Sequence, residues 1–169
     1  MDYHNKIYSF EPVIAEGARV LVLGSMPGKQ SLQKQQYYAN PRNQFWEIIF
    51  TLFNKEDPGE YEDRKAFLKA RGIALWDSIY SCERSGSLDS SIKYEEPNDI
   101  TGLLKKYHTI QCIAFNGGKS FTSFQKYHNL HGLPDKTLEK LPSTSPVPGK
   151  YIKNLEEKIE DWKVIKEHV

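Results

Sequence analysis

The chain contains the apolar run ARVLVL at residues 18–23, which is followed at once by the turn-forming segment GSMPG at 24–28. A short, β-branched run without polar alternation is typical of a strand that is buried on both faces, as in a parallel sheet. Similar short runs follow at 73–76, 109–115 and 138–141. The first run therefore predicts a central strand, and the other three predict its companions in an α/β fold.

Helical patterns separate these runs. Amphipathic segments predict helices at residues 45–54, 60–71, 100–107, 119–127 and 155–169, whereas 24–44 and 82–97 are predicted to be loops. Strands that alternate with helices favour a mainly parallel sheet covered by helices. We therefore expect one α/β domain that spans residues 1–169.

Small polar residues gather where the predicted strands end. They lie at 24–28, at Asp77, at 116–118 and at 142–146. Ligands of α/β sheets bind beyond the carboxyl ends of the strands. These four segments therefore predict the position of a binding site.

Composition excludes several classes of function. Lys and Arg total 23 against 22 Asp and Glu, a net charge of +1, so the chain does not coat nucleic acid by charge alone. No apolar run approaches the roughly 20 residues of a membrane span, and the first residues have no signal-peptide core. Two cysteines cannot supply a four-thiolate zinc or iron–sulfur site. We expect a soluble, cytoplasmic monomer without metal or other cofactor and with reduced cysteines.

Three groups of motifs occur in order along the chain: GSMPG at 24–28 with YYANPRNQFW at 37–46, GIALWD at 72–77 with CER at 82–84 and GSLD at 86–89, and LPSTSP at 141–146. Together they resemble the uracil DNA glycosylase superfamily, and most closely its hypoxanthine (deoxyinosine) DNA glycosylases. The resemblance implies a three-layer α/β/α sandwich with a central four-stranded sheet. It also implies an enzyme of base excision repair that extrudes a damaged base from DNA and hydrolyses its N-glycosidic bond.

The resemblance assigns the water-positioning role to Asn43. Mismatch-specific uracil glycosylases carry an Asn where this chain has Met26, and a thioether orients water poorly. The hypoxanthine branch uses an Asn in the Pro-Arg-Asn segment, which corresponds to Asn43. The alternative is that Asn43 only caps the helix that begins at residue 44 or 45.

Base recognition is assigned in the same way. Tyr38 corresponds to the aromatic residue that stacks on the extruded base, unless it is merely a core residue. Asp77 corresponds to the position that reads the pairing edge of the base. A carboxylate there accepts the N1–H of hypoxanthine, whereas N1 of adenine is itself an acceptor. The alternative is that Asp77 is a structural residue that caps the next turn. The remaining candidates at the base are Gly24, Ser25, Met26 and Asn116.

The resemblance also implies contacts with damaged DNA. The loop made of Pro142, Ser143, Thr144, Ser145 and Pro146 corresponds to the one that pinches the backbone, unless it is a plain proline-rich turn. A phosphate patch is predicted from Arg42 and Arg84 with Lys29, Lys34 and Lys150, and an apolar wedge from 147–149. Uracil-specific enzymes have a His where this chain has Leu141, so imidazole assistance is absent.

Three interpretations remain open from the sequence. The first is a monofunctional hypoxanthine glycosylase, since no Lys in a motif position would form a Schiff base. The second is a glycosylase whose main substrate is uracil, and the third is a DNA-binding relic that has lost catalysis.

Overall fold

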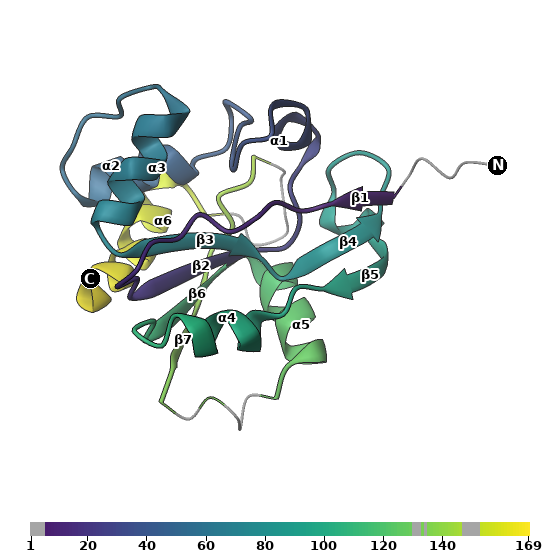
Figure 1. Cartoon of the computed structure of the whole chain (residues 1–169). Helices are drawn as coiled ribbons and strands as arrows, with labels where there is room; N and C mark the ends of the chain where they lie inside the picture. The colour runs from purple at the N-terminus through teal and green to yellow at the C-terminus, as the bar shows by residue number, and fades with distance from the viewer. Residues whose placement is uncertain (1–5, 130–132, 134, 147–152) are drawn as a thin grey trace.

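The computed structural model describes residues 6–129, 133, 135–146 and 153–169, and a four-stranded parallel sheet lies at its centre (Figure 1). The strands are β2 (Val20–Gly24), β3 (Ile73–Asp77), β6 (Cys112–Asn116) and β7 (Thr137–Leu141), in the order β3-β2-β6-β7. The last residues of neighbouring strands are in register, with Gly24 beside Asp77 and Asn116 beside Leu141. The polar segments predicted to form the site therefore meet at one edge.

Helices cover both faces of this sheet, as the sequence predicted. Val20 and Val22 of β2 belong to one buried cluster, and Leu21 and Leu23 belong to another, because successive side chains of a strand point to opposite faces. The first face packs on α2 (Phe45–Leu52), α3 (Tyr61–Ala70) and α6 (Leu155–Trp162), and the second packs on α4 (Ile100–Lys106) and α5 (Gly118–Tyr127) (Figure 1). The three-layer α/β/α sandwich is confirmed.

A second, smaller sheet was not predicted. Strands β1 (Lys6–Tyr8), β4 (Ile79–Glu83) and β5 (Lys93–Pro97) pair antiparallel in the order β1-β4-β5. The prediction that 82–97 is a loop is therefore wrong at both ends. The sequence KYEEP of β5 gave no strand signal because most of its residues are exposed and no apolar residues alternate along it.

The structure also differs from the predictions for two segments, the loop 24–44 and the helix 155–169. The predicted loop 24–44 contains the short helix α1 (Lys29–Lys34), which is largely polar and has no apolar face that would reveal it. The predicted terminal helix 155–169 is α-helical only to Trp162 and continues as the 3₁₀ helix η4 (Lys163–His168). A further 3₁₀ turn, η2 (Asp89–Ser91), lies between β4 and β5.

No helix within the described ranges is long and apolar enough to cross a lipid bilayer. Cys82 and Cys112 are both buried and free, and burial raises the pKa of each thiol. Both side chains therefore serve as small core residues.

Candidate active site

A cavity of about 590 Å³ opens where the strands of the central sheet end. Most of the predicted site residues line it: Gly24, Ser25, Met26, Tyr38, Asn43, Asp77, Asn116, Ser143, Thr144, Ser145 and Pro146. Arg42, Arg84 and Pro142 are not among its lining residues. Segments that are far apart in the chain thus contribute to a single concave site, as expected at the strand ends of an α/β sheet.

The carboxylate of Asp77 lies in the floor of this cavity. A Cβ at Gly24, its neighbour in β2, would lie only 2.6 Å from Oδ1 of Asp77, so a glycine is needed there. Asp77 is 4% exposed, and its Oδ2 atom is buried without a hydrogen-bond partner among the described residues. Leaving such an oxygen unpaired is costly, so a ligand that brings an N–H donor gains from pairing with it.

Burial also controls the charge of Asp77. Removal from water raises the pKa of Asp77 to about 7. The nearby guanidinium of Arg84 acts in the opposite direction, and the charge of Asp89 raises the pKa further. The carboxyl group therefore changes its protonation state near neutral pH, which is common for side chains at functional sites.

Tyr38 forms an aromatic wall of the cavity. Its ring stacks on Phe45 with 4.1 Å between centroids and 23° between planes, and its hydroxyl accepts a hydrogen bond from Nδ2 of Asn116 over 3.2 Å. Its backbone has φ 55°, which is uncommon for a bulky residue and occurs at strained, functional positions. Burial and the charge of Asp77 raise the pKa of Tyr38, so it remains a neutral phenol.

Asn43 lines the cavity and also holds the start of α2. Its Oδ1 accepts a hydrogen bond from the backbone N–H of Phe45, the first residue of α2, over 2.9 Å, although the N-cap residue of this helix is Gln44. Its Nδ2 has no hydrogen-bond partner within the described part of the chain. A carbonyl oxygen has two lone pairs, so Oδ1 retains one acceptor site and Nδ2 offers its donors. The same amide is therefore able to hold a water molecule.

The structure gives Asn116 a bridging role that the sequence did not suggest. Its Nδ2 donates to the hydroxyl of Tyr38 and, over 3.0 Å, to Oγ1 of Thr144, while its Oδ1 accepts from the Thr144 N–H over 3.0 Å. Both Nδ2 hydrogens are therefore occupied. Asn116 ties the aromatic wall to the loop after β7, and only an acceptor site on Oδ1 remains for a base.

The loop 142–146 is fixed by further bonds. Thr144 is fully buried, and its carbonyl accepts from the N–H of Gln44 over 2.9 Å, which links it to the residue after Asn43. The carbonyl of Pro142 accepts from Nε1 of Trp162 over 3.0 Å. These hydrogen bonds fix the backbone of the loop, and Ser143, Ser145 and Pro146 line the cavity.

The two positions that depart from the uracil-specific pattern lie in the core. Met26 is 7% exposed and packs with Ile79 and Cys82 in a third apolar cluster, and it is also among the residues that line the cavity. Leu141 is also buried, as a member of the apolar cluster between the central sheet and α2, α3 and α6. Neither side chain has a polar group to offer a water molecule or a base.

Arg84 does not belong to a surface phosphate patch, which corrects the prediction from the sequence. It is 7% exposed, and its Nη2 donates to the carbonyl of Pro27. Arg42, Lys29 and Lys34 are exposed, whereas Lys150 and the predicted wedge 147–149 lie outside the described residues.

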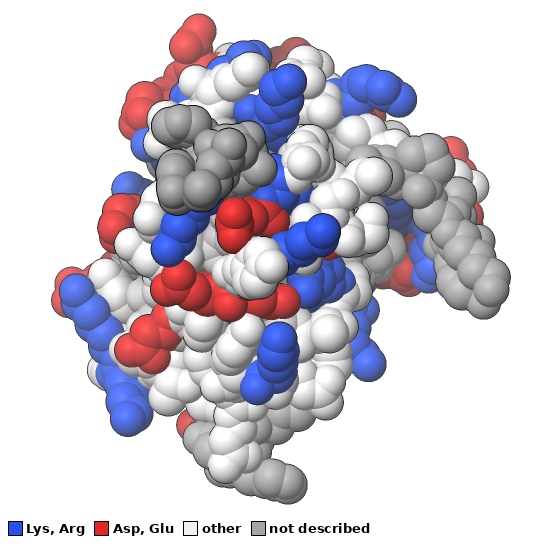
Figure 2. All heavy atoms as spheres, turned by 90° about the vertical axis from the view of Figure 1, so that its right-hand side faces the viewer, with Lys and Arg blue, Asp and Glu red and all other residues white. Residues whose placement is uncertain are grey.

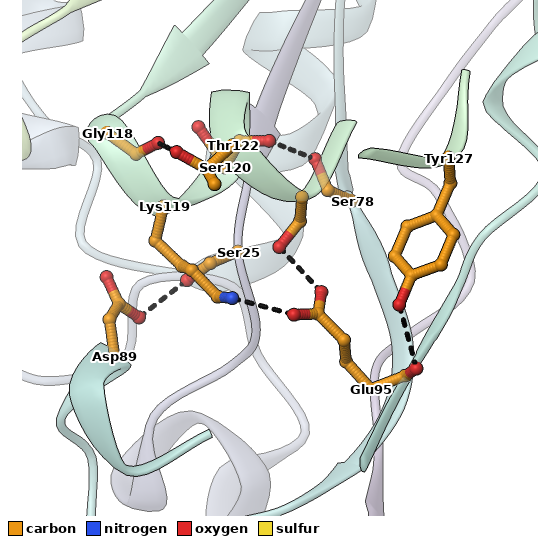
Figure 3. Close-up of polar contacts among 10 residues, drawn as sticks. Ser25, Ser78, Asp89, Glu95, Gly118, Lys119, Ser120, Thr122 and Tyr127 are labelled. Atoms are coloured by element: carbon orange, nitrogen blue, oxygen red, sulfur yellow. Dashed lines mark hydrogen bonds and ion pairs between the residues drawn. The ribbon is translucent and has the colours of Figure 1, made fainter. Parts of the chain in front are cut away.

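The loop between β4 and β5 adds cavity residues to which the sequence assigned no role. Ser87, Leu88, Asp89 and Ser90 all line the cavity. Oγ of Ser25 donates to Oδ1 of Asp89 over 2.7 Å (Figure 3), and Oγ of Ser87 accepts from the N–H of Lys29 over 2.9 Å. These hydrogen bonds join the motif GSLD at 86–89 to the segment that contains GSMPG at 24–28. Both motifs were part of the resemblance.

A second set of contacts joins β5 of the small sheet to helix α5. Glu95 of β5 receives hydrogen bonds from Lys119 over 2.7 Å and from Ser123 over 2.6 Å, both on α5 (Figure 3). Tyr127 also donates to the Glu95 carbonyl. The small sheet is thereby fastened to the helix that follows β6.

Charge is mixed on the side that carries β4 and β5. Figure 2 shows acidic side chains near the centre of this face and basic side chains around them. Positive and negative side chains are therefore interspersed on this face, which is not a uniformly positive surface.

Comparison with known proteins identifies the family of this chain. The family model of the uracil DNA glycosylase superfamily matches residues 11–166, and the chain belongs to this superfamily. It is 36% identical over 162 residues to the hypoxanthine DNA glycosylase of Methanosarcina acetivorans, covering 94% of this chain and 97% of that protein. It is 37% identical over 116 residues to the Methanosarcina barkeri protein of the same name, covering 68% and 73%.

A solved structure agrees with the fold. The solution NMR structure of a Methanosarcina acetivorans protein, described provisionally as a uracil DNA glycosylase, matches with a TM-score of 0.81 and 32% identity. The match covers 96% of this chain and 98% of that one. The resemblance inferred from the sequence motifs is confirmed.

Proposed function

We propose that the protein is a monofunctional DNA glycosylase that removes hypoxanthine from deoxyinosine in DNA, as a step of base excision repair. The observation that carries this proposal is the meeting of Tyr38, Asn43 and Asp77 in one cavity at the strand ends. Two relatives that are named hypoxanthine DNA glycosylase support the choice of base.

Asp77 is proposed to recognise the base. Hypoxanthine presents an N1–H donor beside a carbonyl, and ionised Asp77 has an unpaired, buried oxygen to accept that N–H. Adenine presents an acceptor at N1, so it would leave two acceptors facing each other. A site built around one hydrogen bond strongly rejects a base that cannot form it.

Asn43 is proposed to hold the attacking water. As the N-glycosidic bond breaks, positive charge develops on the sugar. Such a centre accepts weak nucleophiles, so a neutral amide that fixes a water molecule is sufficient and no strong base is needed. Tyr38, stacked on Phe45, would hold the base in position during this step.

Base release from synthetic DNA tests the proposal. End-labelled oligonucleotides that contain deoxyinosine, deoxyuridine or deoxyxanthosine are incubated with the protein and then treated with alkali to cleave abasic sites. We expect cleavage at deoxyinosine that depends on the alkali step, since a monofunctional enzyme leaves the strand intact. Tight binding of this DNA without release of any base would instead support a relic that has lost catalysis.

Uracil is the second candidate substrate. Its N3–H lies beside a carbonyl, so Asp77 would pair with it in the same way, and one similar structure is described as a uracil DNA glycosylase. Met26 and Leu141 oppose this choice because both are apolar and buried. Single-turnover rates on the two lesions, in otherwise identical duplexes, decide between the substrates.

A further inference from the structure

Lys158 is a buried lysine to which the proposed mechanism gives no role. It lies on α6 and is 4% exposed, yet its ammonium forms no ion pair with a carboxylate among the described residues. Its Nζ donates instead to the side-chain oxygen Oε1 of Gln44 over 2.7 Å. Removing an ammonium from water without an opposite charge is unfavourable, and burial accordingly lowers the pKa of Lys158. The contact with Gln44 is therefore the feature that the fold gains from this buried charge.

Gln44 lies where the cavity meets α2. It is the N-cap residue of this helix and directly follows Asn43, whose Oδ1 accepts from the N–H of Phe45. The backbone N–H of Gln44 donates to the carbonyl of Thr144 over 2.9 Å. Since its side chain is bound by Lys158, Gln44 is held through both its backbone and its side chain. The residue next to Asn43 is thus fixed from two directions.

The helix that carries Lys158 also holds the loop 142–146. Trp162 lies one helical turn after Lys158, so both side chains lie on the same face of α6. Trp162 donates to the carbonyl of Pro142, and its ring lies 6.0 Å from that of Phe45 between centroids. Figure 1 shows α6 close to α2. One face of α6 therefore supports both the start of α2 and the loop after β7 from behind the cavity.

We propose that Lys158 is a positioning residue that, through Gln44, holds the Asn43 amide in the orientation that binds the attacking water. This inference rests on the proposed function. Groups that act in a reaction must be held to within about 0.5 Å, and residues behind them supply this restraint. Because Oδ1 of Asn43 is bonded to the backbone of α2, a shift at the start of α2 would change where its Nδ2 points. Lys158 is not among the residues that line the cavity, so its effect on the reaction is indirect.

Lys158→Met tests this role, because methionine is also unbranched but cannot donate to Gln44. We expect the single-turnover release of hypoxanthine to fall by about 10- to 100-fold, as for a displacement of up to about 1 Å, while the affinity for deoxyinosine DNA is unchanged. Lys163→Met is the matched control, since Lys163 is an exposed lysine just beyond α6 that pairs with Glu160 at the surface. The control should alter neither quantity. An unchanged release rate in Lys158→Met would overturn the proposal.

A double-mutant cycle shows whether Lys158 acts through Gln44. Gln44→Met removes the side-chain oxygen but keeps the backbone N–H that bonds Thr144. If the two side chains act as one unit, the double variant should release hypoxanthine no more slowly than the slower of the two single variants. Losses that multiply in the double variant would mean that the residues act independently and would overturn the proposal.

Amide hydrogen exchange separates this proposal from the proposed function, because it requires no catalysis. The N–H of Phe45 bonds Asn43 and the N–H of Gln44 bonds Thr144, so both should exchange about tenfold faster in Lys158→Met, whereas the N–H of Val22 in the central sheet should not. Unchanged exchange at Gln44 and Phe45, or equal acceleration at Val22, would overturn the positioning role. If wild type releases no hypoxanthine, faster exchange confined to these two amides would support the positioning role and refute the proposed function.

Discussion

The carboxylate of Asp77 occupies the space into which a side chain at Gly24 would project. The two residues are neighbours in register across β3 and β2, and a Cβ on Gly24 would lie 2.6 Å from Oδ1 of Asp77. The position of the carboxylate in the cavity therefore depends on a glycine in the neighbouring strand.

Gly24→Ala is predicted to displace Asp77 and to remove most of the activity. The overlap is with a buried carboxylate in the floor of the cavity, and misplacing a reacting group by about 1 Å costs about 100-fold in rate. Single-turnover excision of hypoxanthine measures the loss. The matched control is Gly28→Ala, whose new Cβ would meet Ser87 only at an ordinary 3.4 Å; a loss as large in the control would show that any bulk near the cavity is harmful.

Activity is predicted to rise with pH through the titration of Asp77. Burial raises the pKa of this carboxyl to about 7, and the ionised form accepts the N1–H of hypoxanthine. The rate should therefore be low below pH 7 and level off above it. In Asp77→Asn this rise should be absent, because an amide does not titrate. A wild-type rate that does not change across this range would contradict the assignment.

Stability provides an independent check of the same titration. A carboxyl group whose pKa is raised in the folded state binds more protons folded than unfolded, so it destabilises the fold as pH increases from its unfolded pKa to its folded one. Wild type should therefore lose stability relative to Asp77→Asn between about pH 4 and pH 7, by a few kcal/mol at most. Urea unfolding at several pH values measures the difference.

Thr144→Val is predicted to weaken both the fold and the site. The substitution preserves the shape but removes the hydroxyl that accepts from Asn116, which leaves a buried donor unpaired at a cost of about 1–3 kcal/mol. The free energy of unfolding and the excision rate should both fall. Thr122→Val is the control, because the Thr122 hydroxyl only bonds a carbonyl of its own helix near the surface; equal losses in the two variants would argue against a special bridge.

Arg42→Ala is predicted to weaken DNA binding without changing lesion preference. Arg42 is exposed beside the candidate site, and losing one phosphate contact should reduce the slope of log affinity against log salt by about 1 for damaged and undamaged DNA alike. Binding titrations over a range of salt concentrations measure this. The buried Arg84 offers the contrast, since Arg84→Met should lower stability and leave the salt slope unchanged.

Strand ends were predictable from the sequence because local signals define them. Runs such as 18–23 are apolar and stop at turn-forming residues, so the central sheet, its covering helices and the edge that binds ligands could be derived. β5 could not, because its residues are polar and exposed, and only pairing with β4 makes it a strand. The small sheet is thus a product of tertiary contacts.

The roles of individual residues at the site were less predictable where they depend on tertiary contacts. Arginine is mostly exposed in proteins, so nothing in the sequence indicated that Arg84 is buried and bonded to Pro27. The bridge from Asn116 to Thr144 joins residues 28 positions apart, and it appears only once β6 and β7 lie side by side. The sequence pattern and the family resemblance predicted most of the residues that line the cavity. The hydrogen bonds between these residues could be seen only in the folded structure.

Asn43 is proposed to hold the attacking water in addition to bonding the first N–H of α2. Asn43→Ser separates the two functions, because a serine hydroxyl still accepts the Phe45 N–H but lacks the second polar group of an amide. Asn43→Ala, which lacks both, serves as the comparison for stability.

The decisive measurement is the single-turnover release of hypoxanthine by Asn43→Ser, with unfolding and DNA binding measured on the same protein. We expect a variant that folds and binds deoxyinosine DNA like wild type but releases the base about 100- to 1,000-fold more slowly, the range found when one polar group that acts in the transition state is removed. An Asn43→Ser protein that releases hypoxanthine as fast as wild type would contradict the proposed role of Asn43.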